Sequence, residues 1–198
     1  MKKILFLLLL CMPGLVQAQT MREVFTAMPD SLQQLLSKNN RMDMMDFLDS
    51  KMEARVTNRL DGQSTMETLT EDYLKITLAE QVTLQMKLYS KGEQKILAVV
   101  HTAGGPVLDS YMSFYTPAWE PLPVQVKVPE FSAFEVKDRS ELTVEQVQLL
   151  ESLADMQLTE ITLSPENAKA VFTLSLNILP KEDRDKVREL VKPVEVEL

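Results

Sequence analysis

The chain has 198 residues and a formal net charge of −8, because 21 Lys and Arg residues stand against 29 Asp and Glu residues. This acidic balance argues against a nucleic-acid partner, since nucleic-acid binding requires clustered Lys and Arg. It argues equally against an anionic membrane surface. A chain of this length can bury a hydrophobic core of its own without disulfides or metals.

The N-terminal segment has the layout of a secretory signal peptide. Two lysines precede a short apolar run, and the small-residue pattern Val16-Gln17-Ala18 follows it. We expect cleavage after Ala18, which leaves a single exported domain over residues 19–198. The only cysteine, Cys11, would leave with the signal. No second apolar run reaches the ~20 residues that span a bilayer, so we expect a periplasmic or extracellular protein without a membrane span.

The first expected elements of the exported domain are helices. Residues 20–38 predict a helix or a helix pair that is broken near Pro29. A further helix is expected over residues 40–54, with Asn40 as a favourable N-cap. At ~100° per residue, this helix places apolar and acidic side chains on different sides. The apolar side holds Met44, Met45, Leu48 and Met52, and the acidic side holds Asp43, Asp46, Asp49 and Glu53.

Strict alternation of apolar and polar residues then predicts an antiparallel meander. The alternating strands cover residues 73–78, 82–88 and 109–116, and residues 95–102, which are apolar on both faces, are expected to form a central strand. Four prolines between residues 117 and 129 exclude regular structure, apart from short edge pieces near 124–128. This Pro-rich segment is expected to connect two sub-halves of the domain.

In the second sub-half we expect a helix, a strand pair and a short final helix. The helix covers residues 144–156, and Thr143 and Gln146 are placed as its capping box. The strand pair covers residues 158–163 and 169–178, and a helix is expected in the run KEDRDKVREL. Residues 194–198 can close as a strand. Helices followed by strands, without βαβ alternation, indicate an α+β fold with an antiparallel sheet.

The acidic face of the helix at 40–54 has two interpretations. It can be the solvated side of an amphipathic helix, or it can hold a divalent cation on Asp43, Asp46 and Asp49. The Asp-x-Asp-x-Asp-Gly pattern of a calcium loop does not occur. Phe47 falls on this acidic side, where it either packs under a neighbouring helix or marks a contact surface.

Motifs for common enzyme chemistries are missing from the sequence. The chain has a single histidine, His101, and neither Gly-x-Ser-x-Gly nor a phosphate-binding glycine pattern. With no cysteine after the signal, a zinc site would depend on carboxylates, which is unusual. His101 is therefore expected to hydrogen-bond within the sheet. Trp119, in the Pro-rich segment, either pins that segment when buried or makes contacts when exposed.

Three stretches resemble an uncharacterised domain-of-unknown-function family. They are NNRMDMMDFLDSKMEARVTNRLDGQSTMETLTEDYL, QMKLYS and DSYMSFYTPAWEPL, and the resemblance is clearest over residues 21–122. The family comprises exported proteins of Gram-negative gut and oral bacteria of the Bacteroides group. The resemblance implies an exported single-domain protein and implies no reaction, cofactor or partner. It marks motif positions without assigning them a role: Asn58, Arg59, Asp61, Asp72, Tyr73 and Trp119.

Together these features predict an exported, soluble, non-enzymatic binding or accessory protein in the periplasm, with no cofactor. Its partner is expected to be an unidentified protein or a small apolar ligand. The alternatives are a cation binder or carboxylate-based hydrolase using the acidic helix, a carrier of a small apolar ligand, and a module whose exposed edge strand pairs with a partner. The candidate recognition residues are Phe47, Asn58, Arg59 and Trp119.

Overall fold

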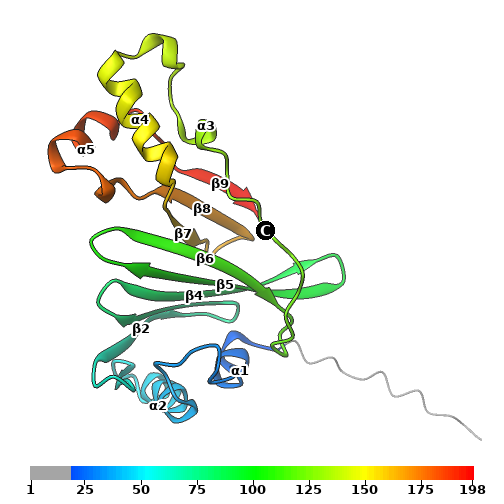
Figure 1. Ribbon diagram of the computed structural model, residues 1–198. Helices are drawn as coiled ribbons and strands as arrows, with labels where there is room; N and C mark the ends of the chain where they lie inside the picture. The colour runs from blue at the N-terminus through cyan, green and yellow to red at the C-terminus, as the bar shows by residue number, and fades with distance from the viewer. Residues whose placement is uncertain (1–18) are drawn as a thin grey trace, which may run out of the picture.

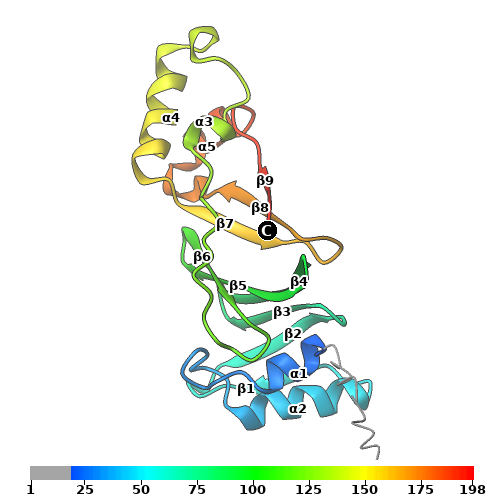
Figure 2. The same cartoon turned by 90° about the vertical axis from the view of Figure 1, so that its right-hand side faces the viewer.

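We analysed a computed structural model, which describes residues 19–198. The predicted signal peptide, residues 1–18, lies outside the described residues. The chain forms successive layers (Figures 1 and 2). Two N-terminal helices cover one face of a six-stranded sheet, a three-stranded sheet lies against the other side, and further helices lie beyond it. This arrangement confirms the predicted α+β class. None of the helices in the described part of the chain is long and apolar enough to cross a membrane.

The six-stranded sheet is an antiparallel meander in chain order. Its strands are β1 (Arg55–Thr57), β2 (Gln63–Leu69), β3 (Tyr73–Ala79), β4 (Val82–Lys91), β5 (Gln94–Gly104) and β6 (Leu108–Tyr115). The four strands β3 to β6 were predicted, whereas β1 and β2 were missed. β1 has only three residues. In β2 the sequence QSTMETL is mostly polar and its register with β3 shifts between Met66 and Thr68, which breaks the period of two.

The N-terminal helices begin at capping boxes. In α1 (Met21–Thr26) the box joins Thr20 and Glu23, and in α2 (Lys38–Asp49) it joins Ser37 and Asn40. The prediction that α2 begins at Asn40 was therefore wrong, because Asn40 is the third residue of the box rather than the N-cap. The helix also ends earlier than predicted, since Lys51 adopts a left-handed φ of 57°.

The predicted second helical piece before residue 38 does not form. Residues 27–37 run as turns and bends around the fully buried guanidinium of Arg41. Arg41 donates hydrogen bonds to the carbonyls of Met28 and Leu36, and it also pairs with Asp30. These carbonyls accept hydrogen bonds from the buried guanidinium and are therefore not available to a helix. This explains why the predicted second helical piece does not form.

The core between these helices and the sheet is rich in methionine. Six of the methionines are at most 6 % exposed: Met21, Met28, Met44, Met45, Met66 and Met86. They pack with Leu and Ile side chains in one continuous cluster. Met in this setting acts as adaptable core filler. Met52, which the helix prediction placed among these residues, lies after the end of α2 and is 58 % exposed.

The three-stranded sheet packs on the other side of the meander through a second core. It contains β7 (Thr159–Leu163), β8 (Lys169–Leu174) and β9 (Val194–Glu197), so the predicted strand pair is extended by the C-terminal strand. The outward amides of β7 are capped by meander side chains. Thr159 donates to Asp109, Ile161 donates to Ser110, and Leu163 donates to Gln85, each at 3.0 Å.

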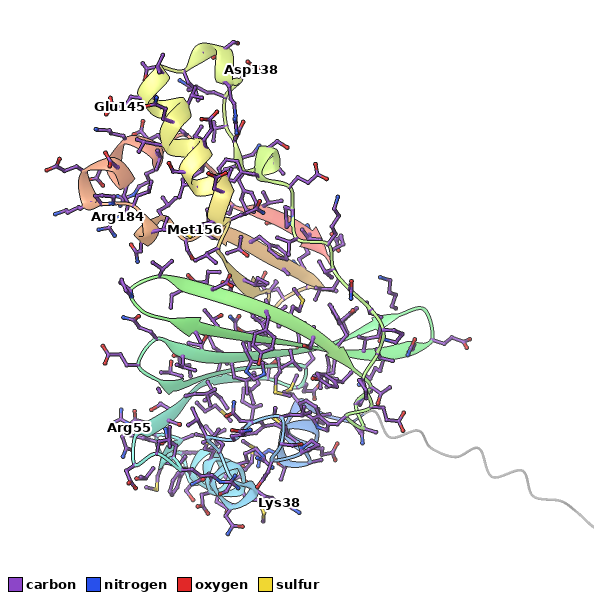
Figure 3. The ribbon with its side chains drawn as sticks, viewed as in Figure 1. Lys38, Arg55, Asp138, Glu145, Met156 and Arg184 are labelled. Atoms are coloured by element: carbon purple, nitrogen blue, oxygen red, sulfur yellow. The ribbon has the colours of Figure 1, made fainter. Side chains whose placement is uncertain are left out.

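The remaining helices form a small cluster at the far end of the molecule (Figure 1). They are α3 (Phe131–Phe134), α4 (Val144–Met156) and α5 (Lys181–Val187), with 3-10 turns at Arg139–Glu141 and Leu176–Ile178. The predicted capping box of Thr143 and Gln146 is present at the start of α4. Leu150, Leu153, Val187 and Leu190 form their separate core. Figure 3 shows Glu145, Met156 and Arg184 at this end, opposite Lys38 and Arg55.

Candidate functional site

The structure spreads the acidic residues of α2 along its exposed side. Asp43, Asp46 and Asp49 are all exposed. Asp49 is neutralised by Arg22 of α1 through two hydrogen bonds of 2.6 and 3.0 Å. Over residues 19–198, no group of three or more His, Cys, Asp or Glu side chains is placed to hold a metal ion. The fold therefore does not bring the three candidate carboxylates to a common point.

Two of the four candidate recognition residues are buried. Asn58 donates to the Ser64 hydroxyl and the Leu78 carbonyl, and its own oxygen accepts from two amides of the turn between β1 and β2. Trp119 is 7 % exposed, and its indole N–H donates to the carbonyl of Val24 in α1 at 2.8 Å. Neither side chain is available at the surface, and Trp119 pins the Pro-rich segment to α1.

The other two candidates also serve the fold. Arg59 pairs with Asp30, and its backbone N–H donates to the carbonyl of Leu35. This attaches the turn between β1 and β2 to the connection between the N-terminal helices. Phe47 is half-buried and packs against the methionine-rich core, which corresponds to the packing alternative of the sequence analysis.

An open groove lies between α1 and α2. Its volume is about 490 Å³, and Met42 and Met45 supply its apolar surface. Arg22, Glu23, Lys38 and Asp46 contribute charges of both signs. Because its charges are of both signs, this groove favours no particular class of ligand.

The edge strand β6 carries the clearest binding geometry in the molecule. In an antiparallel ladder, alternate residues direct both N–H and C=O to the same side. The Phe114 carbonyl accepts from Leu122 outside the sheet, so Ser110 and Met112 also point away from β5. Within residues 19–198, the outward backbone groups of Ser110 and Met112 and the N–H of Phe114 have no hydrogen-bond partner. We call this stretch the open edge.

A second extended segment faces the open edge. Residues 122–128, with the sequence LPVQVKV, follow β6 and rise past it toward α3; we call them the strap (Figure 2). Half-buried Leu122, Val124 and Val126 alternate with exposed Pro123, Gln125 and Lys127. The strap makes a single backbone hydrogen bond within the described chain, from Leu122 to Phe114 at 2.9 Å. The strap therefore alternates half-buried and exposed residues as a strand does, but it forms no ladder of backbone hydrogen bonds within the described residues.

Two adjoining cavities separate the open edge from the strap. They measure about 310 and 260 Å³ and share Met112 and Gln125 as walls. We call them together the edge groove. The lining of the first includes Val126, Ile161 and Phe172, and that of the second includes Phe114, Tyr115, Leu122 and Val124. The edge groove thus combines apolar side chains of both sub-halves with the outward backbone groups of β6.

An aromatic pair stands beside the edge groove. The rings of His101 and Tyr111 stack with centroids 4.9 Å apart and an interplanar angle of 10°. Tyr111 is 60 % exposed and is one of the residues that border the first cavity. Burial lowers the pKa of His101, so its imidazole is neutral at neutral pH. The sequence analysis expected His101 to hydrogen-bond within the sheet; the structure gives it a stacking partner.

Sequence reasoning did not single out the edge groove as a site. Two signals were nevertheless present. The β6 sequence LDSYMSFY contains neither Lys nor Pro, which commonly protect edge strands. The strap alternates apolar and polar residues although prolines flank it. Neither signal shows from sequence alone that β6 is an edge strand.

Comparison with known proteins agrees with this fold. A domain of an uncharacterised protein from Porphyromonas gingivalis W83 has a similar solved structure, with a TM-score of 0.72 and 19 % sequence identity. The match covers 89 % of this chain and 92 % of that domain. The comparison with curated proteins found no match. The model of a protein family of unknown function, DUF3256, matches residues 15–196, so the chain belongs to the DUF3256 family, and the uncharacterised family expected from the sequence is confirmed.

Proposed function

We propose that this protein is an exported, non-enzymatic binding protein that captures an extended segment of a partner protein in the edge groove. The partner segment adds a strand to β6. Backbone hydrogen bonds provide affinity in this mode of recognition, and pockets for alternate side chains provide specificity. The observation that carries the proposal is the open edge, which faces a groove with several apolar side chains and the extended strap on its far side.

The choice of an extended peptide follows from the hydrogen-bonding groups. Ser110 and Met112 present donors and acceptors at the spacing of a strand, and only an extended backbone matches that row over several residues. A small apolar ligand could use the apolar side chains of the groove and would leave this row of backbone groups without partners.

The other candidate functions receive less support from the geometry. A carrier of an apolar ligand would need an internal cavity, and the methionines that suggested one fill the core instead. A cation site or a carboxylate-based hydrolase would need converging carboxylates, which α2 spreads along one exposed side. Export rests on the signal-peptide layout of residues 1–18. N-terminal sequencing of the protein recovered from the periplasm or medium tests it, with Gln19 expected as the first residue.

The binding proposal is tested with the blocked peptide Thr-Val-Thr-Val-Thr-Val-Thr carrying a fluorophore. We expect a rise in fluorescence polarisation as the protein is titrated. The same peptide with N-methyl groups on its backbone amides cannot donate hydrogen bonds, and we expect it not to bind. Equal binding of both peptides would show that apolar contact alone is responsible and would refute strand addition.

A matched pair of variants locates the site on the protein. Met112→Pro removes an outward N–H of the open edge, where proline is tolerated because that N–H bonds no neighbouring strand. Met112→Ala shortens the side chain and keeps the N–H. We expect Met112→Pro to abolish binding and Met112→Ala to weaken it. Unfolding curves of both variants separate lost binding from lost structure.

A further inference from the structure

We propose that the captured segment carries an arginine between two apolar residues, with its guanidinium stacked on Tyr111 beside Asp109. This inference rests on the proposed function, because it specifies the side chains of the peptide in the edge groove. The expected partner segment is neutral to basic and has an arginine between two apolar residues. Three features of the groove support it: the faces of β6, the position of Tyr111 and the placement of charge.

The alternation of β6 assigns each peptide position to one side of the sheet. Met112 and Phe114 point toward the second core, whereas Tyr111 and Tyr115 point toward the side of the N-terminal helices. A strand added to β6 follows the same alternation. Its residues opposite Ser110 and Met112 therefore face the first cavity, where Met112, Val126 and Val128 supply accessible apolar side chains. These side chains favour apolar peptide residues and penalise buried charges.

The residue between those two apolar positions lies directly opposite Tyr111. Because the outward hydrogen bonds belong to Ser110 and Met112, Tyr111 forms a non-hydrogen-bonded pair with the peptide. Side chains come closest in such pairs, with Cα atoms about 4.5 Å apart. Tyr111 is backed on one face by His101, and its side chain is 60 % exposed. It therefore offers an open aromatic surface to one peptide side chain.

The charges near this ring favour a cation. Asp109 lies two residues before Tyr111 in β6 and is exposed, and its carboxylate reaches the edge of the sheet, where it accepts a hydrogen bond from the Thr159 amide of β7. A diagonal neighbour in a ladder is within reach of a long side chain. An arginine opposite Tyr111 can stack its guanidinium on the ring and approach the Asp109 carboxylate at the same time. The neutral imidazole of His101 does not oppose that charge.

The experiment compares three blocked peptides that differ at the central residue. They are Thr-Val-Arg-Val-Thr, the same peptide with citrulline, and the same peptide with threonine. Citrulline keeps the length and planar end of arginine but carries no charge. We expect the arginine peptide to bind roughly fivefold tighter than the citrulline peptide. We also expect the difference to shrink in high salt because the charges are solvent-exposed.

Variants of the two β6 residues assign the preference. In Tyr111→Ala the affinity ratio of arginine to citrulline should fall by more than half, and in Tyr111→Phe it should persist, because the ring remains. Asp109→Asn keeps the acceptor for Thr159 and removes the charge, so the ratio should fall in part. Equal affinities for arginine and citrulline in the unmodified protein would overturn this inference and leave strand addition intact. Failure of all three peptides to bind would instead refute the proposed function itself.

Discussion

The two edges of the six-stranded sheet are treated differently by the fold. The β1 edge is three residues long, lies beside α2, and has its Thr57 carbonyl occupied by the Asn40 side chain at 3.1 Å. The β6 edge is eight residues long and contains the open edge. Short, covered edges are the usual protection against unwanted pairing. The contrast supports the proposal that β6 is left open for binding, since the same sheet protects its other edge.

The β7 edge of the three-stranded sheet is also protected. Its outward amides at Thr159, Ile161 and Leu163 are all satisfied, and each acceptor is a side chain of the meander. The fold thus closes one edge with a helix and a second with side chains. The open edge begins at Ser110, whose side chain is one of those that close β7. Closing groups are therefore available in this region, and the middle of β6 is left without them.

Opening the β7 edge should have the largest effect on stability. Gln85 is buried, accepts from Leu163 and Tyr73, and donates to the Ile161 carbonyl. Gln85→Ala leaves these buried groups without partners, so we expect the free energy of unfolding to fall by about 2–4 kcal/mol. Urea unfolding measures the loss. Gln125→Ala, on the exposed side of the strap, is the control and should change stability by less than about 0.5 kcal/mol.

Uncovering the β1 edge should have a smaller effect. Asn40→Ala removes the hydrogen bond to Thr57 and half of the capping box with Ser37. We expect a loss of about 1 kcal/mol in urea unfolding. Asn39→Ala, at the neighbouring exposed position of α2, should have little effect. If both variants behave alike, Asn40 does not protect the β1 edge.

Acid should weaken the attachment of the β1–β2 turn. The hydrogen bond from Arg41 lowers the pKa of Asp30 against a smaller opposing effect of burial, and Arg59 lowers it further. Because the folded pKa lies below the unfolded value of about 3.9, this stabilisation is complete above that value. It is lost as pH falls through the folded pKa. Asp30→Asn should flatten the acid limb of unfolding free energy against pH; an unchanged limb would exclude Asp30 as a contributor.

The sequence predicted the parts of the fold that depend on local periodicity. Strands β3, β4 and β6 follow alternation, β5 contains a continuous apolar run, and the Thr143–Gln146 capping box is a local pattern, so all of these could be predicted directly. The start of α2 was misplaced because Asn40 is a good N-cap residue by itself. The capping box of Ser37 decides the boundary instead.

The candidate site depended on contacts that local patterns do not contain. Asn58 and Trp119 were singled out as recognition residues, yet hydrogen bonds to Leu78 and Val24 hold them inside the fold. The open edge follows from strand order, from the path of the strap and from the way β7 packs on the meander. These are tertiary features, so sequence reasoning could only name an exposed edge strand as one alternative.

Amide hydrogen exchange tests the central claim most directly, measured residue by residue by NMR on the exported protein. With the peptide Thr-Val-Thr-Val-Thr-Val-Thr in excess, we expect slower exchange at the amides of Ser110, Met112 and Phe114. The amides of β1 should not change. Unchanged exchange along β6, or equal protection at both edges of the sheet, would contradict the account.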